Sequence, residues 1–282
     1  MARGIITAAF VDLSGTLHIG DEAISGAVEA LEKLRKLAEI RFVTNTTKES
    51  KNNLHNRLRK CGFQIDKSEI FSSLSAARKL IDEKKYRPML FLEEEALEDF
   101  RDLDTSSPNA VVVGLAPSQF HYDRMNDAFR LLLEEGTELI AIHKGKYYRR
   151  EDGLALGPGP FICGLEYATG KKATVVGKPE KTFFELALQT FDKPVEMSNV
   201  VMIVILSQMN KKQFHLNSND HEILCDDVND DVLGAINAGA RGILVQTGKY
   251  RTGDEEKVPE EHRNVARTFV EAVEIIQQNN VK

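Results

Sequence analysis

Asp12 is the first residue whose type and position suit chemistry. It follows the apolar run 5–11, which is typical of a buried strand, and precedes a Ser-Gly-Thr turn. In an open α/β sheet, ligands bind at the carboxyl ends of the strands, and an aspartate there can act as a nucleophile that forms an aspartyl-phosphate. An aspartate that caps the helix beginning near Ser25, or that merely ends the strand, is the alternative.

Small polar or basic residues follow two further predicted strands. Thr44 and Asn45 come after the strand at 40–44, and their hydroxyl and amide groups could bind an anionic oxygen; capping of a helix beginning at Lys48 explains them equally well. Lys178 comes after the strand at 174–176. Its ammonium could neutralise a phosphate, although surface lysines are common.

The segment 226–231 holds four aspartates within six residues. Carboxylate oxygens are the ligands that Mg²⁺ prefers, and a solvated helix start, where acids are favoured by the helix dipole, is the alternative. Each of these four signals is weak alone. Their common position after strands makes them informative together.

Strands alternate with helices in a rhythm that the middle of the chain interrupts. Before residue 73 and after residue 173 the pattern predicts strands at 5–11, 40–44, 70–71, 174–176, 200–206 and 242–245 and helices at 27–37, 48–61, 76–83 and 181–190. Between them it predicts strands at 89–92, 110–113 and 138–142 and helices near 96–100, 122–133 and 160–168. We therefore predict an α/β core of residues 1–72 and 174–282 with a parallel sheet, interrupted by a smaller α/β domain at 73–173.

Composition narrows the functional classes. The 282 residues are 42% hydrophobic and 28% charged, with a net charge of −6, so we expect a soluble protein without nucleic-acid or membrane partners. Three cysteines without metal-ligand spacing suit a reducing compartment, which favours the cytoplasm. The sequence leaves open whether the chain forms a homodimer.

The chemistry-bearing residues resemble a known family. Segment 12–16, Thr44-Asn45, Lys178 and segment 226–231 stand in the order of the four motifs of haloacid dehalogenase (HAD) superfamily phosphatases. The segments 41–50, 154–161 and 174–181 are similar to the branch that holds NagD-type phosphatases and phospholysine/phosphohistidine phosphatase. The resemblance implies a Rossmann-like parallel-sheet core with an inserted α/β cap of the C2 type at 73–173, which would close over the site and select the substrate.

The same resemblance implies a Mg²⁺-dependent phosphatase that acts on a small phosphorylated substrate. It makes Asp12 the catalytic nucleophile. It assigns the metal to Asp12, the Ser14 carbonyl, Asp226 and Asp231. The substrate would be bound by Asp12, Leu13, Ser14, Thr44, Asn45, Thr46 and Lys178.

Ser14 is a departure from the pattern of most phosphatases of the superfamily. Those phosphatases carry a second aspartate two residues after the nucleophile, where it acts as general acid and base. The branch that this chain resembles carries serine at that position, as this chain does. A hydroxyl cannot supply the roughly 10²–10⁴-fold that a positioned proton donor gives. We expect a preference for good leaving groups, as in phosphoramidates, acyl phosphates or pyrophosphate.

An atypical insert at 204–224 is the second departure. In the family an apolar strand like 200–203 runs directly into a Gly-Asp-Asp turn, whereas here 21 residues intervene and Cys225 replaces the glycine. The insert resembles translated non-coding sequence, and a genuine surface loop is the alternative. Either 200–206 or 221–225 must fill the strand. We expect the fold to survive and Mg²⁺ affinity to fall, which leaves a catalytically silent protein that binds a phospho-ligand or a protein partner as the second function class.

Overall fold

The structure is a computed structural model that describes residues 5–150, 152–205, 229–247, 256 and 258–281. Asp226 and residues 206–224 of the insert lie outside the described residues. By its contacts the chain divides into two units. Unit 1 holds Met1–Thr44, His55–Phe71 and Lys181–Lys282, and unit 2 holds Asn45–Leu54 and Ser72–Glu180.

Unit 1 is built on a six-stranded sheet in the order β14-β13-β12-β1-β4-β5. Strand β1 pairs in parallel with both β4 and β12, β12 pairs in parallel with β13, and β13 pairs in parallel with β14. All four residues of β1 are buried, as expected for a strand covered on both faces. The strands are β1 (Ala8–Val11), β4 (Glu39–Thr44), β5 (Ile70–Ser72), β12 (Val200–Ile205), β13 (Arg241–Val245) and β14 (Val265–Ala266).

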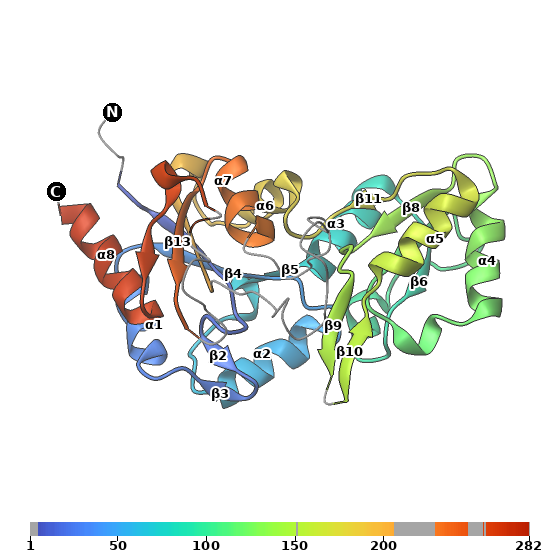
Figure 1. The fold of residues 1–282 in the computed structure, drawn as a ribbon. Coiled ribbons are helices and arrows are strands. Elements are labelled where there is room, and N and C mark those ends of the chain that lie inside the picture. The colour runs from blue at the N-terminus through green and yellow to red at the C-terminus, as the bar shows by residue number, and fades with distance from the viewer. Residues whose placement is uncertain (1–4, 151, 206–228, 248–255, 257, 282) are drawn as a thin grey trace. The chain divides into compact units, whose positions relative to one another are not determined.

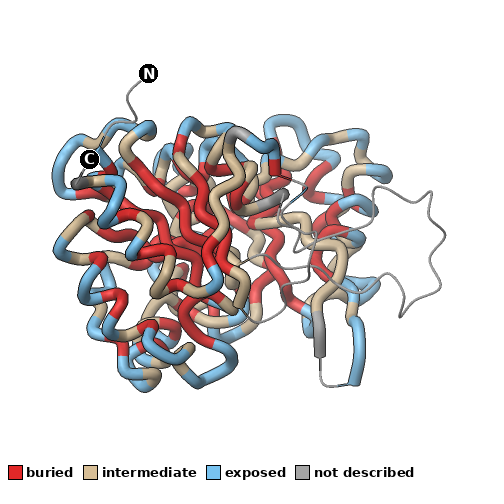
Figure 2. Tube along the Cα trace, turned by 60° about the vertical axis from the view of Figure 1, so that its left-hand side comes forward, coloured by how far each residue is buried: buried red, intermediate tan, exposed pale blue. Residues whose placement is uncertain are grey.

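Helices cover both faces of this sheet (Figure 1). One face carries α1 (Ala27–Arg35) and α8 (Phe269–Val281), which pack against each other, and the other carries α6 (Lys181–Leu188) and α7 (Gly234–Asn237). The buried residues of α1 are Ala27, Ala30, Leu31 and Leu34, a spacing that places them on one helical face. Figure 2 shows the resulting pattern of buried strands and exposed loops. A short hairpin, β2 (His18–Ile19) and β3 (Glu22–Ala23), follows β1.

Unit 2 has its own four-stranded parallel sheet in the order β11-β8-β7-β6. Its core joins the sheet to the helices through buried residues such as Phe91, Val111, Leu132, Leu139 and Ile162. The strands are β6 (Pro88–Phe91), β7 (Ala110–Val113), β8 (Glu138–Ala141) and β11 (Thr174–Val175), with an antiparallel hairpin of β9 (Tyr147–Arg150) and β10 (Gly153–Leu156). The helices are α3 (Ser73–Lys84), α4 (Tyr122–Leu132) and α5 (Gly159–Thr169), and α2 (Lys51–Lys60) spans the boundary between the units.

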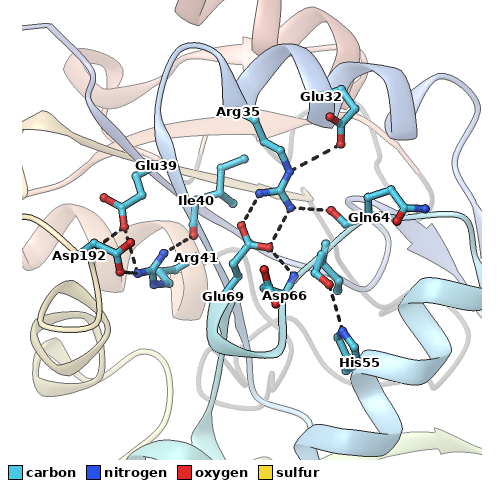
Figure 3. Close-up of polar contacts among 11 residues, drawn as sticks. Glu32, Arg35, Glu39, Ile40, Arg41, His55, Gln64, Asp66, Glu69 and Asp192 are labelled. Atoms are coloured by element: carbon cyan, nitrogen blue, oxygen red, sulfur yellow. Dashed lines mark hydrogen bonds and ion pairs between the residues drawn. The ribbon is translucent and has the colours of Figure 1, made fainter.

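Two arginines make polar contacts on the side of the unit 1 sheet that carries β4 and the edge strand β5 (Figure 3). Arg35 of α1 forms a bidentate ion pair with Glu69, and its guanidinium also donates to the Gln64 carbonyl at 2.8 Å. Hydrogen bonding to Glu69 raises the pKa of Arg35 above its usual range. Arg41 is buried and donates to the Ile40 carbonyl at 2.8 Å. The bonds of Arg35 hold α1 against the segment before β5. Arg41 also donates to Thr190 Oγ1 at 3.0 Å, which joins β4 to the segment after α6.

The expectation that 174–176 resumes the first sheet is wrong. Strand β11 pairs in parallel with β8, with Thr174 opposite Ile140, so it belongs to the sheet of unit 2. Two-residue strands carry too little pattern to reveal their partner, because partner choice depends on the fold of the rest of the chain. The predicted boundaries 1–72, 73–173 and 174–282 stay a prediction about domains.

The α/β class and the parallel core sheet are confirmed. Residues 200–205 form strand β12 beside β1, so of the two segments that could fill this strand, 200–206 and 221–225, the first does so. Within the described part of the chain, no helix has both the length and the apolar character that a membrane crossing requires.

Candidate active site

Asp12 stands directly after β1, near the middle of the six-stranded sheet. The residue is only 6% exposed, and its backbone N–H donates to the Ile203 carbonyl at 2.9 Å. One carboxylate oxygen, Oδ2, accepts a hydrogen bond from Thr16 Oγ1 at 3.4 Å. Helix α1 is preceded by Gly26 and has no side-chain cap, so the alternative that Asp12 caps this helix is excluded.

The turn after Asp12 is tight and fixed by its own backbone. Gly15 has a φ of 78°, a left-handed conformation that favours glycine, and its N–H donates to the His18 carbonyl at 2.7 Å. Leu13 is buried, so its side chain faces the core and only its backbone can serve a ligand. Ser14 is exposed.

Thr16 is a site residue that sequence reasoning missed. It is fully buried, and its hydroxyl both donates to Asp12 and accepts the Ile205 N–H at 2.9 Å. The signal was present in the sequence, because a hydroxyl residue four positions after a strand-end aspartate can reach back across the turn. Thr16 therefore connects the carboxylate to the end of β12.

Thr44 ends β4, which lies next to β1 in the sheet, and is 7% exposed. Asn45 is the next residue in the chain. Helix α2 begins only at Lys51, and Ser50 Oγ accepts the Asn53 N–H at 3.1 Å. The alternative that Thr44 or Asn45 caps a helix beginning at Lys48 is therefore wrong, and a serine directly before the helix was the signal for the true cap.

Asn45 and Lys178 are joined by a reciprocal pair of hydrogen bonds. Asn45 Nδ2 donates to the Lys178 carbonyl and the Lys178 N–H donates to Asn45 Oδ1, both at 2.9 Å. Lys178 is 4% exposed, so the alternative of an ordinary surface lysine is excluded. Burying a charged lysine is unfavourable unless a specific role or partner compensates.

Gly177 makes this pair possible. A Cβ atom built on Gly177 would lie 2.4 Å from the Ile142 carbonyl oxygen and 2.6 Å from Asn45 Oδ1. Both distances are far below van der Waals contact, so the position requires glycine. The sequence shows this glycine but gives no sign of how closely the backbone approaches Asn45.

A polar contact of unit 2 involves Thr47, two positions after Asn45 in the chain. Thr47 Oγ1 accepts the Leu115 N–H at 3.2 Å and contacts His143 Nε2 at 3.5 Å. His143 Nδ1 accepts the Gly145 N–H at 3.1 Å. The residue is half-buried. Desolvation by the surrounding protein disfavours the charged imidazole and lowers the pKa of His143 to about 4, so His143 is neutral at pH 7.

The proposed metal ligands are only partly described. Asp231 lies in a π-helical turn, Asn229–Leu233, that packs against β12 and β13, and it is half-buried. Asp226 lies outside the described residues. Among the residues that the structure places, no three acidic, histidine or cysteine side chains form a group that could hold a metal ion.

The predicted site residues fall into two groups. Asp12, Leu13, Ser14, Thr44 and Asp231 belong to unit 1, while Asn45, Thr46 and Lys178 belong to unit 2. The structure brings Asn45 and Lys178 into direct contact within unit 2. Thr46 is half-buried, and its predicted role in substrate binding stays a prediction.

Two family descriptions match most of the chain. Residues 9–106 match the family described as "Haloacid dehalogenase-like hydrolase", and residues 175–272 match the one described as "HAD-hyrolase-like". The two matches include Asp12, Asn45 and Lys178.

Similar proteins agree with these matches. The chain is 53% identical over 278 residues to haloacid dehalogenase-like hydrolase domain-containing protein 2 of Bos taurus, covering 98% of each chain. It is 36% identical to the phospholysine phosphohistidine inorganic pyrophosphate phosphatase of Homo sapiens, covering 98% of this chain and 95% of the relative. The solved structure of NagD from E. coli K-12 has the same fold, with a TM-score of 0.76 at 20% identity and coverage of 95% and 98%. The chain therefore belongs to the haloacid dehalogenase superfamily, in its NagD-type branch.

Proposed function

We propose that this chain is a Mg²⁺-dependent phosphatase that hydrolyses a small phosphorylated substrate through an aspartyl-phosphate on Asp12. The observation that carries the proposal is the position of Asp12, a nearly buried carboxylate after the central strand β1 of a parallel sheet. Its fixed turn would hold the nucleophile in one orientation. The phosphatase name of the human relative, 36% identical over nearly the whole chain, supports the same chemistry.

In the proposed reaction, an oxygen of the Asp12 carboxylate attacks the phosphorus atom. A new oxygen–phosphorus bond forms while the bond to the leaving group breaks, and the departed leaving group takes up any proton that it needs from water. Water then hydrolyses the acyl phosphate, which releases inorganic phosphate and regenerates the carboxylate. The remaining N–H of the Asn45 amide would donate to a phosphoryl oxygen, and Lys178 would offset the phosphoryl charge, because phosphoryl transfer depends on positioning and electrostatic stabilisation.

The donor types in unit 1 fit Mg²⁺. The Asp12 carboxylate, the Ser14 carbonyl and the Asp231 carboxylate are all oxygen donors, which a hard cation prefers. Together with Asp226 they would hold the ion, which would supply positive charge to the phosphoryl group. In this proposal residues 73–173 form the cap that selects the substrate, and the protein works in the cytoplasm.

The substrate class follows from Ser14. This exposed serine stands where most members of the superfamily carry a general acid, so the leaving group must depart with little proton donation. Phosphoramidates, acyl phosphates and pyrophosphate meet this condition. The human relative is named for phospholysine, phosphohistidine and pyrophosphate, which supports the same class.

A catalytically silent protein that binds a phospho-ligand or a protein partner is the second candidate. The apolar end of β12, where Val204 and Ile205 follow Ile203, favours it, since no carboxylate arrives there with the strand. Intact Asp12, Asn45 and Lys178 favour the enzyme.

Binding of beryllofluoride separates the two candidates. This phosphoryl analogue should bind the full chain only with Mg²⁺ present, and its ¹⁹F signal should vanish in Asp12→Asn. Asp21→Asn, which changes an exposed aspartate of the same unit, should leave binding unchanged. Metal-independent binding that survives Asp12→Asn would favour the silent protein.

A further inference from the structure

Strand β12 does not end where its neighbour β1 ends. The two strands pair in parallel from Ala8 with Val200 to Val11 with Ile203. Beyond this point the Asp12 N–H still donates to the Ile203 carbonyl at 2.9 Å, while β12 continues through Val204 and Ile205. The last two residues of β12 therefore run beside the turn that carries the candidate nucleophile.

Ile205 is fastened to that turn. Its N–H donates to Thr16 Oγ1 at 2.9 Å, and the same hydroxyl donates to Asp12 Oδ2 at 3.4 Å. A Cβ atom built on Gly15 would lie only 2.6 Å from Ile205 Cδ1, so the isoleucine side chain covers the glycine closely. Thr247 Oγ1 also donates to the Gly15 carbonyl, at 2.6 Å. The turn and the strand end thus form one packed unit.

The chemistry of this strand end opposes cation binding. A divalent cation such as Mg²⁺ needs oxygen ligands and keeps several waters. The hydrocarbon side chain of Ile205 offers no oxygen ligand and leaves no room for those waters. On β12 the residue level with the Asp12 turn is apolar. Asp12 belongs to no group of three potential metal-ligating side chains within the described residues.

We infer that Ile205 limits divalent-cation binding at Asp12, and that an oxygen-bearing side chain at this one position would restore it. The inference deepens the proposed function, on which it rests, because it assigns to a single strand position the control of metal affinity at the nucleophile. Val204 serves this purpose less well, since successive side chains of a strand point to opposite faces of the sheet and Val204 is 2% exposed.

Mn²⁺ binding, measured by electron paramagnetic resonance and by calorimetry, tests the inference without requiring turnover. Three variants of the full chain separate the causes. Ile205→Asp adds a carboxylate. Ile205→Asn adds an uncharged amide oxygen on a side chain of the same size as aspartate, and Ile205→Ala only removes bulk. We expect Ile205→Asp to bind Mn²⁺ at least tenfold more tightly than the unsubstituted chain does. Ile205→Asn should gain less Mn²⁺ affinity, and Ile205→Ala should gain little.

Folding is checked in the same samples. Two neighbouring carboxylates repel each other without a cation, so Ile205→Asp should melt at a lower temperature than the full chain without metal and recover with Mg²⁺. The double variant Asp12→Asn/Ile205→Asp should lose the gained Mn²⁺ affinity, which locates the cation at Asp12.

The outcomes are distinct. If the full chain already binds Mn²⁺ as tightly as Ile205→Asp, or if Ile205→Asp gains nothing over Ile205→Ala, the inference is overturned, whether or not the chain hydrolyses phosphates. If Ile205→Asp gains Asp12-dependent Mn²⁺ affinity but hydrolyses no phosphorylated compound, the inference stands and the proposed function fails.

Discussion

Asn45 and Lys178, 133 positions apart in the chain, hold each other through two hydrogen bonds of 2.9 Å. The amide group of one side chain satisfies both backbone groups of Lys178, its N–H and its carbonyl. The pair fixes the backbone of a lysine that is only 4% exposed. The two residues are thus linked by structure before any ligand arrives.

Asn45→Ala should remove both bonds together with the proposed phosphoryl contact. We expect activity to fall at least about 100-fold, as for the loss of one preorganised donor, and stability to fall by about 1–3 kcal/mol. Phosphatase assays and urea unfolding measure the two effects. Asn53→Ala, on the exposed side of α2, should change stability by less than about 0.5 kcal/mol. An Asn45→Ala enzyme with full activity would contradict the role of this side chain.

Gly177→Ala should displace Asn45 without touching its chemistry. The added Cβ would lie 2.6 Å from Asn45 Oδ1 and 2.4 Å from a backbone oxygen, so we expect a loss of about 1–3 kcal/mol in unfolding free energy. Gly164→Ala in α5 is the matched control, because nothing lies within 4 Å of its added Cβ. The unfolding free energy of this control should rise by about 0.5–1 kcal/mol, because alanine is favoured over glycine inside a helix. Equal effects from both substitutions would show that crowding at Gly177 is not important.

The sequence could predict strands where a continuous apolar run is bounded by polar residues. The run at 5–11 predicted β1, and the position of Asp12 after it was correct because a strand end follows directly from where the apolar run stops. The prediction that 174–176 joins the same sheet as β1 was wrong because this strand is too short to show its partner. Two paired residues of β11 fit either parallel sheet, and only their backbone pairing with Ile140 and Ala141 of β8 assigns them to unit 2.

Other parts of the site depend on contacts that no local pattern encodes. The burial of Lys178 and its bonds to Asn45 join residues that are distant in sequence, and the sequence shows them only as a lysine and an asparagine. The same holds for Ile205, which reads as the end of an apolar run. Its effect on the Asp12 turn becomes visible only through the register of β12 and the bond to Thr16.

Acid should destabilise the protein through His143. Its folded-state pKa of about 4 lies below the ordinary value of 6.5, so the unfolded chain binds a proton first as the pH falls. The resulting loss of stability begins near pH 6.5, is complete near pH 4 and amounts to about 3 kcal/mol. His143→Asn keeps an acceptor near the Gly145 N–H but cannot titrate, so its unfolding free energy should change less over this window. Parallel pH profiles for the two proteins would exclude His143 as the cause.

Removal of the insert should strengthen the metal site. Deleting 204–224 and replacing Cys225 with glycine joins Ile203 to Gly-Asp226, so a carboxylate takes the place of Ile205 beside the Asp12 turn. We expect activity to rise and to saturate at lower Mg²⁺ concentration. Deleting only 206–224 keeps Ile205 and should bring little gain. If the shorter deletion restores activity equally, the bulk of the segment and not its first residues is responsible.

Leaving-group quality should control turnover, because Ser14 cannot donate a proton efficiently. We expect kcat/KM for p-nitrophenyl phosphate and acetyl phosphate to exceed that for glycerol 3-phosphate by at least about 100-fold, the low end of the effect of a general acid. Ser14→Asp tests the cause directly, since the position is exposed and accepts a carboxyl group without repacking. This variant should raise hydrolysis of glycerol 3-phosphate about tenfold or more and leave that of acetyl phosphate nearly unchanged, because only the poor leaving group needs the proton. Equal gains on both substrates would instead indicate that the new carboxylate acts on the metal ion or on binding.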